Sequence, residues 1–232
     1  LERYERATES DVLLRHLGRE EGTGPMTAAA GVAVVRRDFP FHVAYNLAER
    51  LVGEAKKVGK ARQPVRSTLT YHALFDSSVL DPEKILRAYS SFTTRPFLLR
   101  RDGAPASDPP GRYEPWPDTC ERVRQFKGLT SEDPGTGETR FPKTRAARIR
   151  KLLSDAAQAR LVDRGLSDRL ADKAEHEWDD AKKVLPDEVL KGMGIRALFD
   201  IMELSDLLPD SYLHSPSPAD GSEPATTQEV QE

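Results

Sequence analysis

The chain has 232 residues, of which 38% are hydrophobic and 31% are charged, and its 35 basic and 38 acidic side chains give a net charge of −3. So balanced a total supplies no electrostatic argument for nucleic-acid binding. The single cysteine excludes an internal disulfide and a cysteine-cluster zinc site. No apolar run reaches the roughly 18 residues of a membrane-spanning helix, so we expect no membrane partner and a cytoplasmic location.

The N-terminal third predicts a β-α-β unit that follows an opening helix over residues 1–17. Residues 26–35 form a short, valine-rich apolar run, which is typical of a buried strand. A helix with an N-cap at Asp38 and a C-cap at Gly59 is then predicted. Residues 67–75 alternate as a second strand. The apolar face expected for the helix consists of Phe41, Ala44, Tyr45, Ala48, Leu51, Val52 and Ala55.

The rest of the chain reads as mainly helical, with long loops at 101–117 and 131–138 that are rich in Pro, Gly and Asp. Ser167 is the predicted cap of one of its helices. The composition of residues 214–232 predicts a disordered tail. Helices are expected at 82–89 and near 119–128, 141–164, 167–184 and 195–208.

Several short motifs resemble the second palm domain in the large subunit of type III CRISPR effector complexes. Residues 27–35 are similar to the Ser-Ala-Gly strand of that family, and Phe39-Pro40-Phe41 resembles the start of its next helix. The strand at 69–78 is similar to the family's second strand. Further resemblances lie at Thr94-Arg95-Pro96-Phe97, Phe141-Pro142-Lys143-Thr144 and 197–204.

This resemblance implies an α+β fold, with part of a ferredoxin-like palm at 1–90 and a mainly helical region at 91–213. It also implies a nucleotide-binding domain of a CRISPR-associated or related prokaryotic antiviral defence protein. The full-length form would polymerise or cyclise ATP with divalent metal, and RNA or CRISPR complex subunits are further expected partners. The rest of the family's sheet would precede Leu1, so we expect residues 1–232 alone to aggregate or to melt well below the full-length protein.

The chain departs from this family at the acidic hairpin that holds the metal, which in the family lies upstream of the first helix. Mg²⁺ or Mn²⁺ is therefore expected only with that motif, and we assign this chain no catalytic residue and no metal ligand. Ala29 and Thr70 also stand where the family has Ser and Asp. An alternative function is a non-catalytic module that binds protein or RNA on a palm scaffold, and whether the protein is an enzyme stays open.

Lys56, Lys60 and Gly31 are the predicted nucleotide-binding residues. The two lysines are four apart and share a helix face, where like charges repel by about 0.2–0.5 kcal/mol. In related GGDEF diguanylate cyclases, whose helix ends in a similar Ala-Lys-x-x-Gly-Arg motif, such positions meet nucleotide phosphate. Alternatively, the lysines complement the helix dipole. Gly31 either admits a base or ribose or permits close helix packing. Lys57 is turned about 100° away from the shared face.

Other charged residues predict ordinary solvated surface. Asp179 and Asp180 are adjacent on a helix, so their carboxylates diverge and do not share a metal ion. The basic segment at 143–164 either contacts RNA or an acidic partner, or is a solvated helix. His72 is expected to be solvated or hydrogen-bonded.

Overall fold

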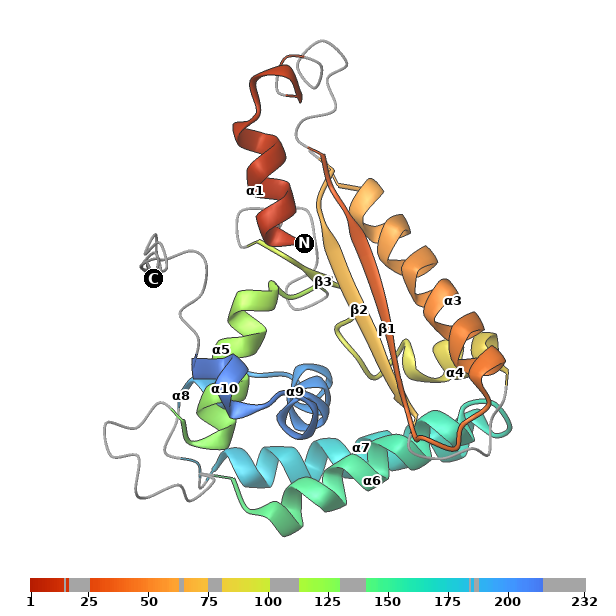
Figure 1. The fold of residues 1–232 in the computed structure, drawn as a ribbon. Coiled ribbons are helices and arrows are strands. Elements are labelled where there is room, and N and C mark those ends of the chain that lie inside the picture. Colours follow the sequence, from red (N-terminus) through yellow and green to blue (C-terminus); the bar gives the residue numbers. More distant parts are fainter. Residues whose placement is uncertain are drawn as a thin grey trace, which may run out of the picture.

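The computed structural model describes residues 1–14, 16, 26–62, 65–74, 81–100, 113–129, 141–183, 185 and 188–214. Their sheet has three strands in the order β1 (Ala29–Val35), β2 (Thr68–Leu74) and β3 (Phe97–Leu98). β1 and β2 are parallel, whereas β3 pairs antiparallel with the start of β2. The protein is therefore α+β, as predicted, with a small mixed sheet and many helices (Figure 1).

Helix α3 (Phe41–Lys60) connects the two parallel strands and covers one face of the sheet, which confirms the predicted β-α-β unit (Figure 1). Both predicted caps are wrong. The N-cap is Pro40, and Asp38 pairs instead with Arg36. Gly59 lies inside the helix, whose C-cap is Ala61. A Cβ at Gly59 would come within 2.4 Å of the Arg66 carbonyl oxygen. This glycine permits a close approach of the chain to the helix end.

The apolar stripe of α3 is only partly covered. Its buried residues are Val43, Leu47, Leu51, Ala55 and Gly59. Phe41 and Tyr45, which were predicted to belong to the buried face, are 81% and 59% exposed. They continue the row of Ala48 and Val52, whose backbone lies against β1. Because β1 is the last strand of the described sheet, nothing among the described residues covers the start of this row.

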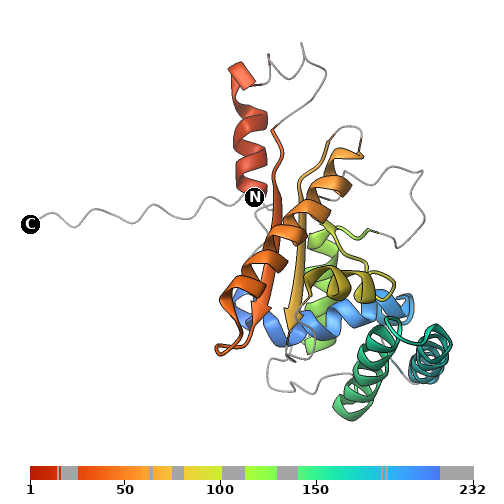
Figure 2. The same ribbon diagram turned by 90° about the vertical axis from the view of Figure 1, so that its right-hand side faces the viewer.

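Helix α4 (Pro82–Tyr89) packs against α3, and α1 (Glu2–Ser10) lies at the upper end of the sheet in Figure 1. The other helices lie on the opposite face and at the lower end of the sheet. Figure 2 shows α3 in front of the sheet, and α5 and α9 behind it. The larger hydrophobic cluster lies on this far side and contains the side chains of Tyr71, Phe97, Trp178 and Phe199. The helices on the far side and at the lower end are α5 (Trp116–Lys127), α6 (Lys143–Ala159), α7 (Arg164–Lys182), α8 (Glu188–Lys191), α9 (Ile195–Leu207) and α10 (Asp210–His214).

The predicted helices occur with shifted ends, except that the opening helix predicted over residues 1–17 ends at Ser10, because the backbone of Asp11 is extended. The helix at 82–89 is confirmed, and α7 begins three residues before the predicted cap. Its cap is Asp163, whose carboxylate accepts a hydrogen bond from the Leu166 amide at 3.0 Å, while Ser167 is buried inside the helix. None of the described helices is long and apolar enough to cross a membrane. The predicted loop at 131–138, most of the one at 101–117 and almost all of the predicted tail lie outside the described residues.

Candidate functional site

The predicted phosphate-binding lysines lie at the C-terminal end of α3. Lys56 and Lys60 are both exposed, and neither forms an ion pair with another described residue. Lys57 differs, because its Nζ atom lies 2.8 Å from a carboxylate oxygen of Glu54. Of these three lysines, only the middle one is therefore neutralised within the described part of the protein.

Gly31 lies directly beneath α3. A Cβ atom at this position would come within 2.5 Å of the Val52 amide nitrogen, 2.7 Å of the Leu51 Cβ and 2.8 Å of the Ala48 carbonyl oxygen. Real Cβ atoms do not approach backbone so closely, so only glycine fits here. Gly31 faces helix backbone rather than open space, which favours the packing alternative for this residue and separates it from the exposed lysines.

A buried ion network lies on the other side of the sheet. It is formed just before β3 begins, beside the part of β2 that β3 does not pair with. The guanidinium of Arg95 donates to Asp200 Oδ1 at 2.7 Å, to the Tyr71 carbonyl at 2.9 Å and to Glu203. The amide and hydroxyl of Thr94 each donate to Asp200 Oδ2 at 2.7 Å. Arg95 thus binds a backbone carbonyl of β2 just beyond the two residues of β2 that pair with β3.

The charges of this network are fixed by their surroundings. Burial opposes the charged form of Arg95, but the neighbouring carboxylates of Asp200 and Glu203 favour it, and the pKa of Arg95 lies above its ordinary value. Burial is also the main cause that raises the pKa of Tyr71 well above its usual range. Arg95 therefore stays a cation and Tyr71 a neutral phenol, and the cation has two carboxylates against it. Its guanidinium donates to Asp200, Glu203 and both oxygens of Tyr71, so the network joins β2 to the segment before β3 and to Asp200 and Glu203.

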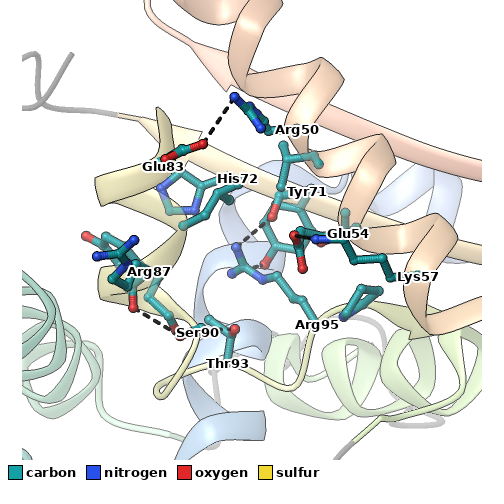
Figure 3. Close-up of a pocket in the computed structure, with 15 residues that line it drawn as sticks. Arg50, Glu54, Lys57, Tyr71, His72, Glu83, Arg87, Ser90, Thr93 and Arg95 are labelled. Carbon is teal, nitrogen blue, oxygen red and sulfur yellow. Dashed lines mark hydrogen bonds and ion pairs between the residues drawn. The ribbon is translucent and has the colours of Figure 1, made fainter. Parts of the chain in front are cut away.

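A pocket of about 410 Å³ opens beside this network. It lies between α3, α4, β2 and the segment that leads from α4 to β3 (Figure 3). The pocket is lined by cations and by hydroxyl groups. Lys56 and Lys60 are not among its lining residues. The lining residues are Arg50, Leu51, Glu54, Lys57, Thr70, Tyr71, His72, Glu83, Leu86, Arg87, Tyr89, Ser90, Thr93, Arg95 and Pro96.

The cations at the pocket differ in how far they are neutralised. Arg50 lies 3.1 Å from a carboxylate oxygen of Glu83, and Lys57 pairs with Glu54 (Figure 3). Arg87 has no acidic partner among the described residues, and it is exposed at the end of α4. The pocket therefore presents one uncompensated guanidinium together with two cations in exposed pairs, which are weak.

His72 lies in the pocket wall, and it is buried rather than solvated. Only 2% of it is exposed, its ring packs edge-on against Tyr89 at 4.7 Å between centroids, and its Nε2 atom has no hydrogen-bond partner among the described residues. Burial, and then the nearby charge of Arg95, lower its pKa to about 3. The imidazole is therefore neutral at physiological pH.

Several of the other candidate charges are neutralised locally. Asp179 pairs with Lys182 at 3.1 Å and Asp180 with Lys183 at 2.7 Å, which confirms a solvated helix face. Three cations of the basic segment on α6 are also paired: Arg148 with Glu177, Arg150 with Asp206 and Lys151 with Asp155. Within the described residues, no group of three or more His, Cys, Asp or Glu side chains could hold a metal ion.

Sequence reasoning missed the Arg95 network, although both of its halves lie in motifs that carried the resemblance. The two partners are 105 residues apart in the chain. One signal was present: Asp200 and Glu203 are three residues apart in an otherwise apolar helix. Two carboxylates on one face of a buried helix require a cation, because an unpaired buried charge is very costly.

Taken together, the fold and the pocket define an α+β protein with a parallel β-α-β unit and a polar, cation-lined cavity beside it. No protein-family model matches the chain, and no curated protein matches it.

Proposed function

We propose that this chain is a nucleotide-binding palm domain of a CRISPR-associated or related prokaryotic antiviral defence protein, in which Lys56 and Lys60 hold the phosphates of ATP. The observation that carries the proposal is the selective pairing at the end of α3. Glu54 neutralises Lys57, whereas Lys56 and Lys60 are exposed on one face with no acidic partner among the described residues. A bound anion would remove the repulsion between them.

The scaffold beneath these lysines supports the proposal. The last turns of α3 are held against the sheet by the close contact at Gly59 and by the Thr68 hydroxyl, which donates to the Ala55 carbonyl at 2.7 Å. A helix end fixed in this way presents both lysines without a further ordering cost to the backbone. Such preorganisation is what makes a phosphate site effective.

The proposed role of this chain is phosphate binding. The resemblance implies that the full-length protein polymerises or cyclises ATP with Mg²⁺ or Mn²⁺, whose acidic ligands the family places upstream of these elements. Positioning and charge stabilisation account for most of such phosphoryl chemistry. Lys56 and Lys60 would therefore act by holding the triphosphate, and they would transfer no proton.

Calorimetric titration of ATP into the chain tests this proposal. A charge-assisted contact contributes roughly 1.5–3 kcal/mol, so Lys56→Ala should weaken ATP binding by about tenfold to a hundredfold. The melting temperature should change little, because an exposed lysine at a helix end contributes only about 0.3–1 kcal/mol to stability.

Lys183→Ala is the matched control, because Lys183 is also an exposed lysine at the C-terminal end of a long helix. Its substitution should leave ATP affinity unchanged. Equal affinities for the two variants would show that the basic end of α3 is structural, and would contradict the proposed site.

A non-catalytic interaction module on the same scaffold is the second candidate. It is favoured by the exposed apolar residues Phe41, Tyr45 and Val32, which lie on α3 and at the edge of the sheet. A wild-type chain that binds no ATP but binds a partner protein or RNA through this edge would support the module instead.

A further inference from the structure

We propose that the pocket between α3, α4 and β2 is a second binding site, and that its ligand is a sugar phosphate. This site is distinct from the proposed ATP site, because its lining contains Lys57 and neither Lys56 nor Lys60. Lys57 is turned about 100° from Lys56 around the same helix. Either site can therefore exist without the other.

The phosphate would be recognised by the cations of the pocket. Arg87 has no acidic partner among the described residues, so its guanidinium keeps its full capacity for a bidentate contact with phosphate oxygens. Lys57 and Arg50 lie in the opposite wall, on α3 (Figure 3). Their carboxylate partners are at least half exposed. Such exposed pairs are weak and exchange readily for a better anion.

Hydroxyl groups of the ligand would meet the acceptors inside the pocket. The Ser90 hydroxyl donates to the Arg87 carbonyl at 3.0 Å, and the Thr93 hydroxyl donates to the Tyr89 carbonyl at 3.4 Å. Because the protons of these hydroxyls are already used, their oxygens are left as acceptors. Acceptors of this kind suit the O–H groups of a sugar and repel a bare phosphate.

His72 gives an independent indication that the pocket takes a polar ligand. Its side chain is 2% exposed and lies in the pocket wall, yet its Nε2 atom has no hydrogen-bond partner among the described residues. A buried polar atom without a partner is rare and costly in a folded protein. A ligand hydroxyl, or a water held by the ligand, would satisfy this nitrogen.

The dimensions of the pocket match a small ligand. Its volume of about 410 Å³ falls within the range of pockets that enclose small molecules. The pocket offers cations together with two hydroxyl acceptors, of which Ser90 is exposed and Thr93 is buried, so it can bind both an anionic end and a hydroxyl-bearing part of one ligand. A ribose phosphate, either free or as part of a mononucleotide, has this arrangement.

The test is calorimetric titration of ribose 5-phosphate, AMP and inorganic phosphate into the Lys56→Ala protein, in which the proposed ATP site is disabled. Ribose 5-phosphate and AMP should bind with saturation, and inorganic phosphate about tenfold more weakly, since it offers no sugar hydroxyls. Adding Arg87→Gln to this protein should weaken the binding of both esters by about tenfold or more.

Lys84→Gln is the matched control, because Lys84 is an exposed cation on the same helix that pairs with Asp81 and does not line the pocket. It should leave all affinities unchanged, and thermal melting of each variant checks that the fold is retained. The absence of saturable binding, or an Arg87→Gln affinity equal to that of the control, would overturn the site. Equal affinities for inorganic phosphate and ribose 5-phosphate would overturn the assignment of a sugar. None of these results depends on whether Lys56 binds ATP.

Discussion

His72 lies on the α3-facing side of β2, with its ring against Tyr89 and 2% of its surface exposed. Burial lowers its pKa to about 3, with a further contribution from the charge of Arg95. In an unfolded chain the imidazole has a pKa of about 6.5. Between these two values the unfolded state binds the proton and the folded state does not. Stability is therefore lost as the pH falls from about 6.5 towards 3.

The predicted consequence is a pH-dependent stability that substitution of His72 reduces. Acidification from about pH 7 to about pH 5 should cost the wild type roughly 2 kcal/mol through this residue, at about 1.4 kcal/mol per pH unit below 6.5. In His72→Gln that part of the loss should disappear, whatever the absolute stability of the variant. Urea denaturation at both pH values measures it. His42→Gln, at an exposed position on α3, should behave as the wild type. Parallel curves for all three proteins would contradict the buried, neutral imidazole.

At the scale of the elements, the contact between α3 and β1 depends on Gly31. Gly31→Ala would force a Cβ against helix backbone at 2.5 Å, and backbone cannot yield as a flexible side chain can. We expect this variant to lose about 1–3 kcal/mol of unfolding free energy. Gly53→Ala is the control on the same helix, because nothing lies within 4 Å of the added methyl group. It should raise stability by up to about 1 kcal/mol.

Chemical denaturation of the two variants decides the role of Gly31. A large loss for Gly31→Ala and a gain for Gly53→Ala would establish helix packing as its role. A Gly31→Ala protein of wild-type stability with impaired ATP binding would contradict this role and restore the predicted contact with a base or ribose.

The β-α-β unit was predictable because its signals are local. The valine-rich run of β1, the apolar repeat of α3 and the alternation of β2 each lie within a short window. The errors arose where contacts with residues far away in the sequence determine the local structure. Gly59 resembles a helix cap in sequence, but it is buried against Arg66. Phe41 and Tyr45 fit the apolar repeat, but the sheet ends before it reaches them. β3 has only two residues, too few to form a pattern.

The candidate site was less predictable than the fold. The common face of Lys56 and Lys60 was predictable, because a helix fixes the relative direction of residues four apart; their role in phosphate binding stays a prediction. The pocket was not found, since it gathers side chains from α3, β2, α4 and the segment before β3, whose approach no short-range pattern encodes. The pairing of Lys57 with Glu54 and the lack of an acidic partner for Arg87 likewise follow from the folded arrangement.

Across the whole molecule, the Arg95 network ties the sheet to the helical region. It joins Tyr71 on β2 to Asp200 and Glu203 on α9, and all three side chains are buried. β3 and α9 both belong to the region predicted to follow the palm at residue 90, yet both contact β2. The position of the pocket wall formed by Thr93 and Arg95 therefore depends on α9.

The outer edge of the sheet, formed by β1, is exposed and can promote association between molecules. No described strand pairs with the far side of β1, where Val32 is 44% exposed, and the exposed rings of Phe41 and Tyr45 lie on the helix above it. An unpaired edge with apolar side chains is a template for pairing with another chain. This edge is consistent with the first half of the prediction from sequence, that residues 1–232 alone aggregate or melt well below the full-length protein, which stays a prediction.

The last prediction is that self-association proceeds through this edge and that a lysine there suppresses it. Val32→Lys places a charge on the exposed face of the edge strand, which natural proteins use to block edge pairing. We expect the variant to remain monomeric at concentrations at which the wild type forms larger species, with little change in melting, because Val32 is already 44% exposed. Light scattering coupled to size-exclusion chromatography measures this. Val162→Lys makes the same change at a residue that is 92% exposed in the turn between α6 and α7, away from any strand. If association depends only on exposed apolar area, Val162→Lys would reduce it at least as much as Val32→Lys, and edge pairing would be excluded as its cause.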